Sequence, residues 1–173
     1  MSKATAAHVL TRLATAEDAQ EIADLHARAF GPGRFARTAY RVREGADGIS
    51  PFCRVCRIDG RLAAAVRFTP ISIGGSGGAL LLGPLAVEPA FANQGHGRAL
   101  VAEALAAARA AGIRLVVLVG DEPYYARLGF KRVPAGRIAL PGPVNPARLL
   151  AVELVPEALE GFAGRVAAQV DGA

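Results

Sequence analysis

One segment near the middle of the chain limits the possible folds more than any other. Residues 80–87 form an apolar, strand-like run, residues 93–97 form a turn with two glycines, and residues 98–111 form an Ala/Leu-rich helix. A strand, a tight turn and a helix in this order bring unpaired backbone N–H groups and the positive end of a helix dipole to the edge of a sheet. This edge is predicted to bind a phosphate-bearing ligand through the main chain.

Two common phosphate-binding motifs fit this segment poorly. A P-loop ends in Gly-Lys, and the chain contains no such pair. A dinucleotide-binding loop has a third glycine where this chain has Leu100. Asp121 does follow the next strand at about the distance expected of a ribose-binding acid, so a nucleotide ligand such as NAD or ATP stays open as a weaker hypothesis.

A different pair of motifs fits better. Residues 94–99 read Gln-x-x-Gly-x-Ala, and residues 125–130 read Tyr-x-x-x-Gly-Phe. Together these motifs resemble the acyl-CoA-binding core of the GNAT superfamily of N-acetyltransferases. Residues 119–130 and the tail at 153–159 resemble a bacterial subgroup of predicted N-acetyltransferases with unassigned substrates. The resemblance covers most of the chain and is specific from about Gly83 onward.

The resemblance implies an α/β (α+β) fold. It would be a single domain, residues 1–173, with a mixed and mostly antiparallel sheet of about seven strands, splayed central strands and helices on both faces. Residues 134–173 would form a C-terminal strand and tail. Apolar spacing and turn residues predict strands at 8–13, 52–58, 62–73, 80–87, 114–119, 130–133 and 149–155, and helices at 16–30, 35–43, 98–111 and 122–128.

The central strand at residues 80–87 contains the pair Gly83-Pro84. Proline lacks the donor that a strand ladder needs, so this pair predicts a break or bulge that separates the central strands, with a simple edge irregularity as the alternative. In the resembling family the pantetheine arm of CoA runs beside the segment that corresponds to Leu85, Ala86 and Val87. The resemblance implies that N–H groups near Ala86 or Val87 face the thioester carbonyl and stabilise an oxyanion there.

The implied co-substrate is acetyl-CoA or another short acyl-CoA, and no metal ion is implied. Gly95 and Gly97 carry no Cβ, so phosphates can approach the main chain closely. His96 is expected to face solvent or phosphate from the same loop. The residues implied to bind the cofactor are Leu85, Ala86, Val87, Gln94, Gly95, His96, Gly97, Arg98, Ala99 and Leu100.

Acyl transfer in the resembling family is direct attack of an amine on the thioester, so the amine loses a proton and the thiolate gains one. The family motif places the acid at Tyr125, and a phenol stays protonated at neutral pH, as a proton donor must. The alternative is that Tyr125 is only a packing residue of the core. Glu88, at the end of the central strand, is the first candidate for the base. Asp121 is a further candidate that would hold water or the amine, unless it caps the helix at 122–128.

The acceptor is expected to be an amine of a small molecule or a protein, selected by residues 30–43 and the chain after Arg132. The net charge of +5 fits a polyanionic cofactor, whereas scattered arginines and few aromatic residues argue against nucleic acid. No apolar run approaches about 18 residues, and the start of the chain does not resemble a signal peptide. A cytoplasmic protein without membrane contact is therefore expected, and a homodimer stays open.

Two further points bear on function. Cys53 and Cys56 form a lone Cys-x-x-Cys in a predicted strand, where residues three apart point to opposite faces, so ordinary buried thiols are expected rather than a disulfide or a zinc site.

A catalytically silent sensor or interaction module that only binds acyl-CoA is the main alternative to an enzyme. The motif tyrosine, Tyr125, favours the enzyme.

Overall fold

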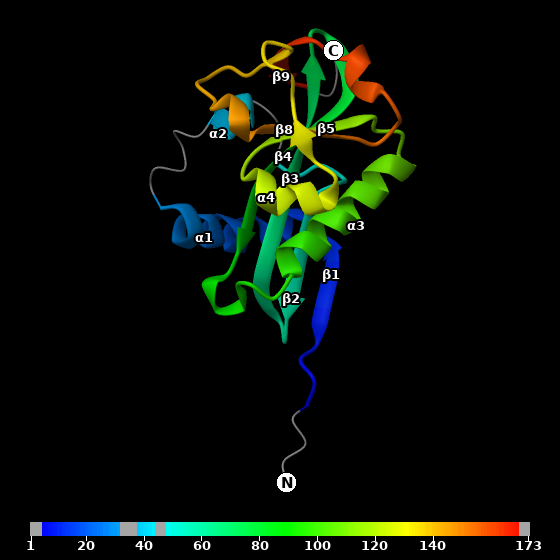
Figure 1. The fold of residues 1–173 in the computed structure, drawn as a ribbon. Helices are drawn as coiled ribbons and strands as arrows, with labels where there is room; N and C mark the ends of the chain where they lie inside the picture. The colour runs from blue at the N-terminus through cyan, green and yellow to red at the C-terminus, as the bar shows by residue number, and fades with distance from the viewer. Residues whose placement is uncertain (1–4, 32–37, 44–47, 170–173) are drawn as a thin grey trace.

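The computed structural model describes residues 5–31, 38–43 and 48–169. Figure 1 shows α3 and α4 in front of the strands. The strands are β1 (Val9–Leu13), β2 (Arg54–Ile58), β3 (Arg61–Ile73), β4 (Ser76–Val87), β5 (Leu115–Val119), β6 (Lys131–Arg132), β7 (Ile138–Ala139), β8 (Leu149–Glu153) and β9 (Gly164–Ala168). The α-helices are α1 (Ala19–Phe30), α2 (Thr38–Arg43), α3 (His96–Ala110) and α4 (Glu122–Tyr125), and the 3-10 helices are η1 (Ala16–Asp18), η3 (Pro89–Phe91), η4 (Ala126–Leu128), η5 (Pro146–Arg148) and η6 (Ala158–Gly161).

The described strands form a mixed sheet in the order β1-β2-β3-β4-β5-β8-β6. Neighbours in this order are antiparallel except β4 and β5, which are parallel. β9 pairs with the end of β3 at Ile71–Ile73, and β7 pairs with β9. The prediction of about seven strands therefore omits β7 and β9. β7 has only two residues and β9 is rich in Gly and Ala, so neither carries a clear strand pattern.

β4 and β5 separate soon after they meet. In the described part of the chain they pair only over Ala79–Leu81 and Leu115–Val117. β4 stays paired with β3 for longer, but the register of that pair shifts after Val66, opposite Gly83-Pro84. Arg43, from α2, donates a hydrogen bond to the carbonyl of Gly83 at 2.8 Å. The predicted break at Gly83-Pro84 is present. Beyond it, the β5-facing edge of β4 has no strand partner among the described residues, and this unpaired edge is named the opening.

Helices cover both faces of this sheet. α3 packs one face through residues such as Leu100 and Ala104, in a core that includes Phe68. α1 packs the other face through Leu25, in a cluster that includes Ala86. The two faces of β4 are therefore directed to different helices, as the alternation of side chains along a strand requires.

A buried carboxylate fixes the start of α1. Asp18 is 1% exposed and accepts hydrogen bonds from Arg12 at 2.7 Å, from Arg57 at 3.0 Å and from the N–H of Thr15 at 2.8 Å. The Arg12 guanidinium holds the pKa of Asp18 well below its usual range. Asp18 thus ties the start of α1 to β1 through Arg12 and to β2 through Arg57, and this sets how α1 lies over the sheet.

Candidate active site

The first turn of α3, the end of β4 and the start of α4 meet at Gly97. A Cβ placed on Gly97 would lie 2.8 Å from the Tyr124 hydroxyl, 3.2 Å from Val87 Cγ2 and 3.5 Å from Leu85 Cδ2. A side chain at this position would therefore push against β4 and α4. Gly97 lies within α3, and the left-handed glycine of the turn is Gly95, with φ 83°. Close packing, rather than an unusual backbone angle, accounts for the glycine at 97.

The turn before α3 presents main-chain donors. The N–H groups of His96, Gly97 and Arg98 lie in the first turn of the helix and therefore have no intrahelical acceptor. Within the described residues no side chain caps this turn either. The Nε2 atom of His96 lies 3.3 Å from Oε1 of Gln94 at the rim of the turn. A row of such donors at the positive end of a 15-residue helix is suited to phosphate, as the sequence predicts.

The other predicted cofactor residues differ in accessibility. Leu100 is fully buried and anchors α3 to the sheet, while Ala99 is exposed on the helix. Leu85 and Val87 are partly buried and pack toward α3, whereas Ala86 is buried on the α1 side. Leu85, Val87 and Ala86 therefore line β4 at the opening, and Leu100 contributes by holding α3 in place.

The direction of the β4 backbone at the opening follows from one hydrogen bond. The N–H of Glu88 donates to the carbonyl of Ala63 in β3 at 2.8 Å. Donor direction alternates along a strand, so the N–H of Val87 is directed away from β3 and toward the opening. Of the two donors that the sequence analysis named, Val87 has the orientation needed to face a ligand there.

Tyr125 lies in α4, directly after β5. Its ring centroid is 5.7 Å from that of Phe130 and 4.9 Å from that of Tyr124, and the ring packs against the α3-side core. Burial raises the pKa of Tyr125 above its usual value of about 10. The phenol therefore stays protonated at physiological pH, which is the state that a proton donor needs.

Gly120 makes room for this tyrosine, although the motif at residues 119–130 assigns this glycine no role of its own. A Cβ on Gly120 would lie 2.6 Å from Cε2 of Tyr125. As a test of Tyr125 as the proton donor, Gly120→Ala is expected to displace the Tyr125 ring and to lower kcat by roughly tenfold or more, because small misplacements of a proton donor are costly. The Kd of acetyl-CoA should stay close to that of the wild type.

Steady-state kinetics and calorimetric titration measure these two quantities. Gly161→Ala is the matched control, because among the described residues a Cβ there meets only Arg114, at 3.6 Å. An equal kcat in the Gly120 and Gly161 variants would show that the position of the Tyr125 ring does not limit turnover.

Tyr124, the neighbour of Tyr125 in α4, is a residue at this site to which the sequence motifs assign no role. Its hydroxyl faces Gly97 across the gap between α4 and α3. Burial raises the pKa of Tyr124, and the nearby Arg98 opposes that shift. The doubled tyrosine at 124 and 125 is the only sequence signal of this contact, and it does not indicate which partner Tyr124 faces.

The two candidate carboxylates lie apart from each other. Asp121 is exposed, and its Oδ1 lies 3.4 Å from a nitrogen of Arg148. Its carbonyl accepts the N–H of Tyr125, but its side chain does not cap α4 within the described residues. Glu88 lies beside α1, where it accepts a hydrogen bond from Arg28 at 2.8 Å. Tyr125 and Asp121 therefore share one side of the site, and Glu88 belongs to the α1 side.

The remaining sequence predictions concern groups outside this opening. Cys53 and Cys56 are free, buried thiols in clusters on opposite faces of the sheet, as predicted. Much of the predicted acceptor segment, residues 32–37, lies outside the described residues. Among the residues that are described, no group of three His, Cys, Asp or Glu side chains is arranged to hold a metal ion, and no helix is long and apolar enough to cross a membrane.

The splayed sheet, the uncapped turn and the tyrosine after β5 together have the layout of an acyltransferase. Residues 19–130 match the family model described as acetyltransferase (GNAT) family. The chain belongs to this family, and its fold is the mixed α/β fold that GNAT structures share.

Individual relatives are similar over nearly the whole chain. The sequence is 29% identical over 160 residues to "Uncharacterized N-acetyltransferase YhbS" of Escherichia coli K12, covering 91% of this chain and 95% of the relative. The crystal structure of Escherichia coli YhbS in complex with CoA has a TM-score of 0.81 and 27% identity, covering 98% of this chain and 94% of that one. A GNAT acetyltransferase of Brucella melitensis in complex with acetyl-CoA has a TM-score of 0.70 and 30% identity, covering 94% and 96%.

Proposed function

We propose that this protein is an acetyl-CoA-dependent N-acyltransferase that transfers an acetyl group to a primary amine of a small molecule or a protein. The observation that carries the proposal is the meeting of the uncapped α3 turn, the end of β4 and α4 at Gly97. The relatives crystallised with CoA and acetyl-CoA support the same co-substrate here.

In this proposal the cofactor follows the opening. Its pyrophosphate accepts hydrogen bonds from the N–H groups of the first α3 turn, at residues 95–98. Its pantetheine arm runs along β4 at residues 85–87, where β5 has diverged. The N–H of Val87 faces the thioester carbonyl and stabilises the negative charge that develops on the oxygen.

The reaction is a single acyl transfer. The amine nitrogen attacks the carbonyl carbon, a C–N bond forms and the C–S bond breaks. Tyr125 donates its phenolic proton to the leaving sulfur and regains a proton from solvent. Glu88, held by Arg28 at the end of β4, accepts the proton of the amine directly or through water. Asp121, exposed beside Tyr125, holds water at that side of the site.

Ligand-dependent stabilisation tests the choice of cofactor. Acetyl-CoA at 100 times its Kd is expected to stabilise the folded protein by about 2.7 kcal/mol. ATP and NAD at the same concentration should stabilise it much less, because neither carries the pantetheine arm that fills the opening along β4. Thermal unfolding with each ligand measures the effect. A larger stabilisation by NAD than by acetyl-CoA would contradict the proposal and favour the nucleotide hypothesis.

A further inference from the structure

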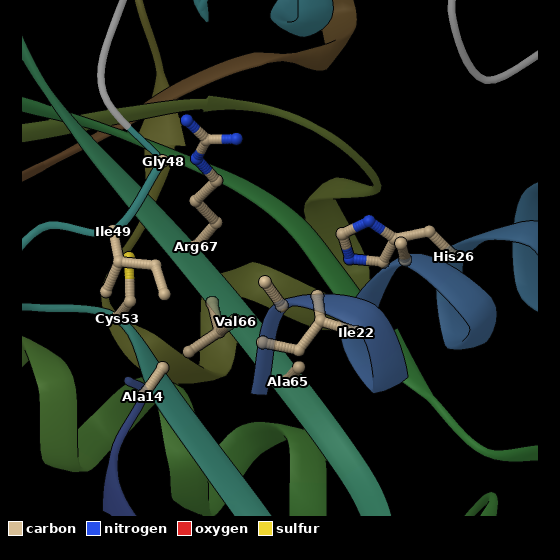
Figure 2. Close-up of a pocket in the computed structure, with 11 residues that line it drawn as sticks. Ala14, Ile22, His26, Gly48, Ile49, Cys53, Ala65, Val66 and Arg67 are labelled. Atoms are coloured by element: carbon tan, nitrogen blue, oxygen red, sulfur yellow. The ribbon is translucent and has the colours of Figure 1, made fainter. Parts of the chain in front are cut away.

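A cavity of about 260 Å³ lies on the α1 face of the sheet, away from the α3 turn. Figure 2 shows Ile22 and His26 of α1 on one side of it, Ile49 and Cys53 on the other, and Arg67 of β3 between them. An apolar cavity of about 150 Å³ is sufficient to hold benzene. This cavity is therefore large enough for an aromatic ring or a branched alkyl group.

The register of the sheet places this cavity beside the proposed acyl position. Its floor includes Ala65 and Val66 of β3, which pair with Ala86 and Leu85 of β4. Neighbouring strands lie about 4.8 Å apart. Because Ala86 and Ala65 belong to the same α1-side cluster, a molecule in the cavity is one strand away from the thioester and on the face opposite α3.

The lining indicates which chemistry the cavity accepts. Most of the described lining is aliphatic, with Ala14, Ala19, Ile22, Ala23, Ile49, Ala65 and Val66 as its members. The lining also includes two nitrogen-bearing side chains, those of Arg67 and of His26, which is 8% exposed. Among the described residues, no carboxylate lines the cavity. Such a lining favours an apolar group and disfavours a second ammonium group, because a buried cation needs a paired anion.

We propose that this cavity binds the side group of the acceptor, and that the acceptor is a monoamine with an aromatic or branched aliphatic group rather than a polyamine. The proposal rests on the N-acyltransferase function above. The apolar group fills the space between α1 and β3, and its amine reaches the carbonyl at residues 85–87 of β4. Selectivity then comes from the first half of α1 and from β3, and not only from residues 30–43 and the chain after Arg132.

Binding and turnover of two amines test the proposal on the wild-type protein. Phenethylamine and 1,4-diaminobutane are titrated against protein saturated with CoA, and their kcat/KM values are measured with acetyl-CoA. Phenethylamine is expected to bind at least about tenfold more tightly and to have a kcat/KM higher by a similar factor. Equal or tighter binding of the diamine, or no binding of phenethylamine, would overturn the proposal.

A cavity-filling variant tests the location. Ala23→Leu fills part of the cavity and is expected to raise the Kd of phenethylamine about tenfold while leaving the KM of acetyl-CoA unchanged. Ala27→Leu is the matched control, an exposed alanine one turn later in α1 that does not line the cavity. Equal phenethylamine affinities in the two variants would overturn the proposed location. Tight phenethylamine binding without acetyl transfer would support the cavity and contradict the enzyme function instead.

Discussion

Replacement of Tyr125 by Phe is expected to lower kcat by roughly 100-fold, while the Kd of acetyl-CoA and the Tm stay close to those of the wild type. The substitution removes one oxygen and keeps the ring in contact with Gly120 and Phe130. A 100-fold loss corresponds to about 2.7 kcal/mol of transition-state stabilisation, which is within the usual contribution of a general acid. Steady-state kinetics give kcat, and calorimetric titration gives the Kd.

The pH profile separates a proton donor from a packing residue. Because burial raises the pKa of Tyr125, wild-type kcat should show no descending limb below about pH 10. The rise of the rate with pH should persist in Tyr125→Phe, since it reports deprotonation of the acceptor amine. Tyr124→Phe, the same change at the neighbouring residue, should lower kcat much less. Undiminished kcat in Tyr125→Phe would assign that tyrosine to packing, and the proton would then come from water.

Replacement of Gly97 by Val is expected to weaken acetyl-CoA binding by roughly 100-fold or more, equivalent to about 2.7 kcal/mol. The new side chain would meet Tyr124, Val87 and Leu85, at distances that begin at 2.8 Å for its Cβ. It would force the first turn of α3 away from β4 and so displace the N–H groups that are proposed to bind the phosphates. Calorimetric titration with acetyl-CoA measures the loss.

A second valine variant controls for the effect of valine on helix stability. Ala102→Val places the same side chain on an exposed position of α3, beyond the first turn. Its cost should be only the lower helix propensity of Val, no more than about 0.7 kcal/mol in stability, with acetyl-CoA affinity unchanged. If the Gly97 variant folds with a similar Tm and binds acetyl-CoA as the control does, the pyrophosphate does not bind at this turn.

Local patterns in the sequence were enough to predict the central strand, the glycine turn and the helix that follows it. The apolar run at residues 80–87, the break at Gly83-Pro84 and the glycines before α3 each depend on neighbours within a few residues. Such features are encoded by backbone angles and by side-chain spacing, so they are readable from one chain.

Contacts between distant segments were not predictable in this way. The fit of Tyr124 against Gly97 depends on how α4 follows a diverging β5, and the pairing of β9 with β3 joins segments about a hundred residues apart. The ion pair of Glu88 with Arg28 joins β4 to α1 and is equally absent from any motif. The cavity beside His26 results from the packing of α1 on β3, and only the assembled fold shows it.

Acetyl transfer to an amine can be tested by analysis of the reaction products. The wild-type protein is incubated with acetyl-CoA labelled with ¹³C in the acetyl group, together with phenethylamine, and the products are identified by mass spectrometry. We predict labelled N-acetylphenethylamine and free CoA in equal amounts, formed only with the protein present and greatly reduced with Tyr125→Phe. A protein that binds acetyl-CoA yet forms no labelled amide from phenethylamine or from a panel of aliphatic, aromatic and peptide amines would contradict the account and identify a silent acyl-CoA-binding module.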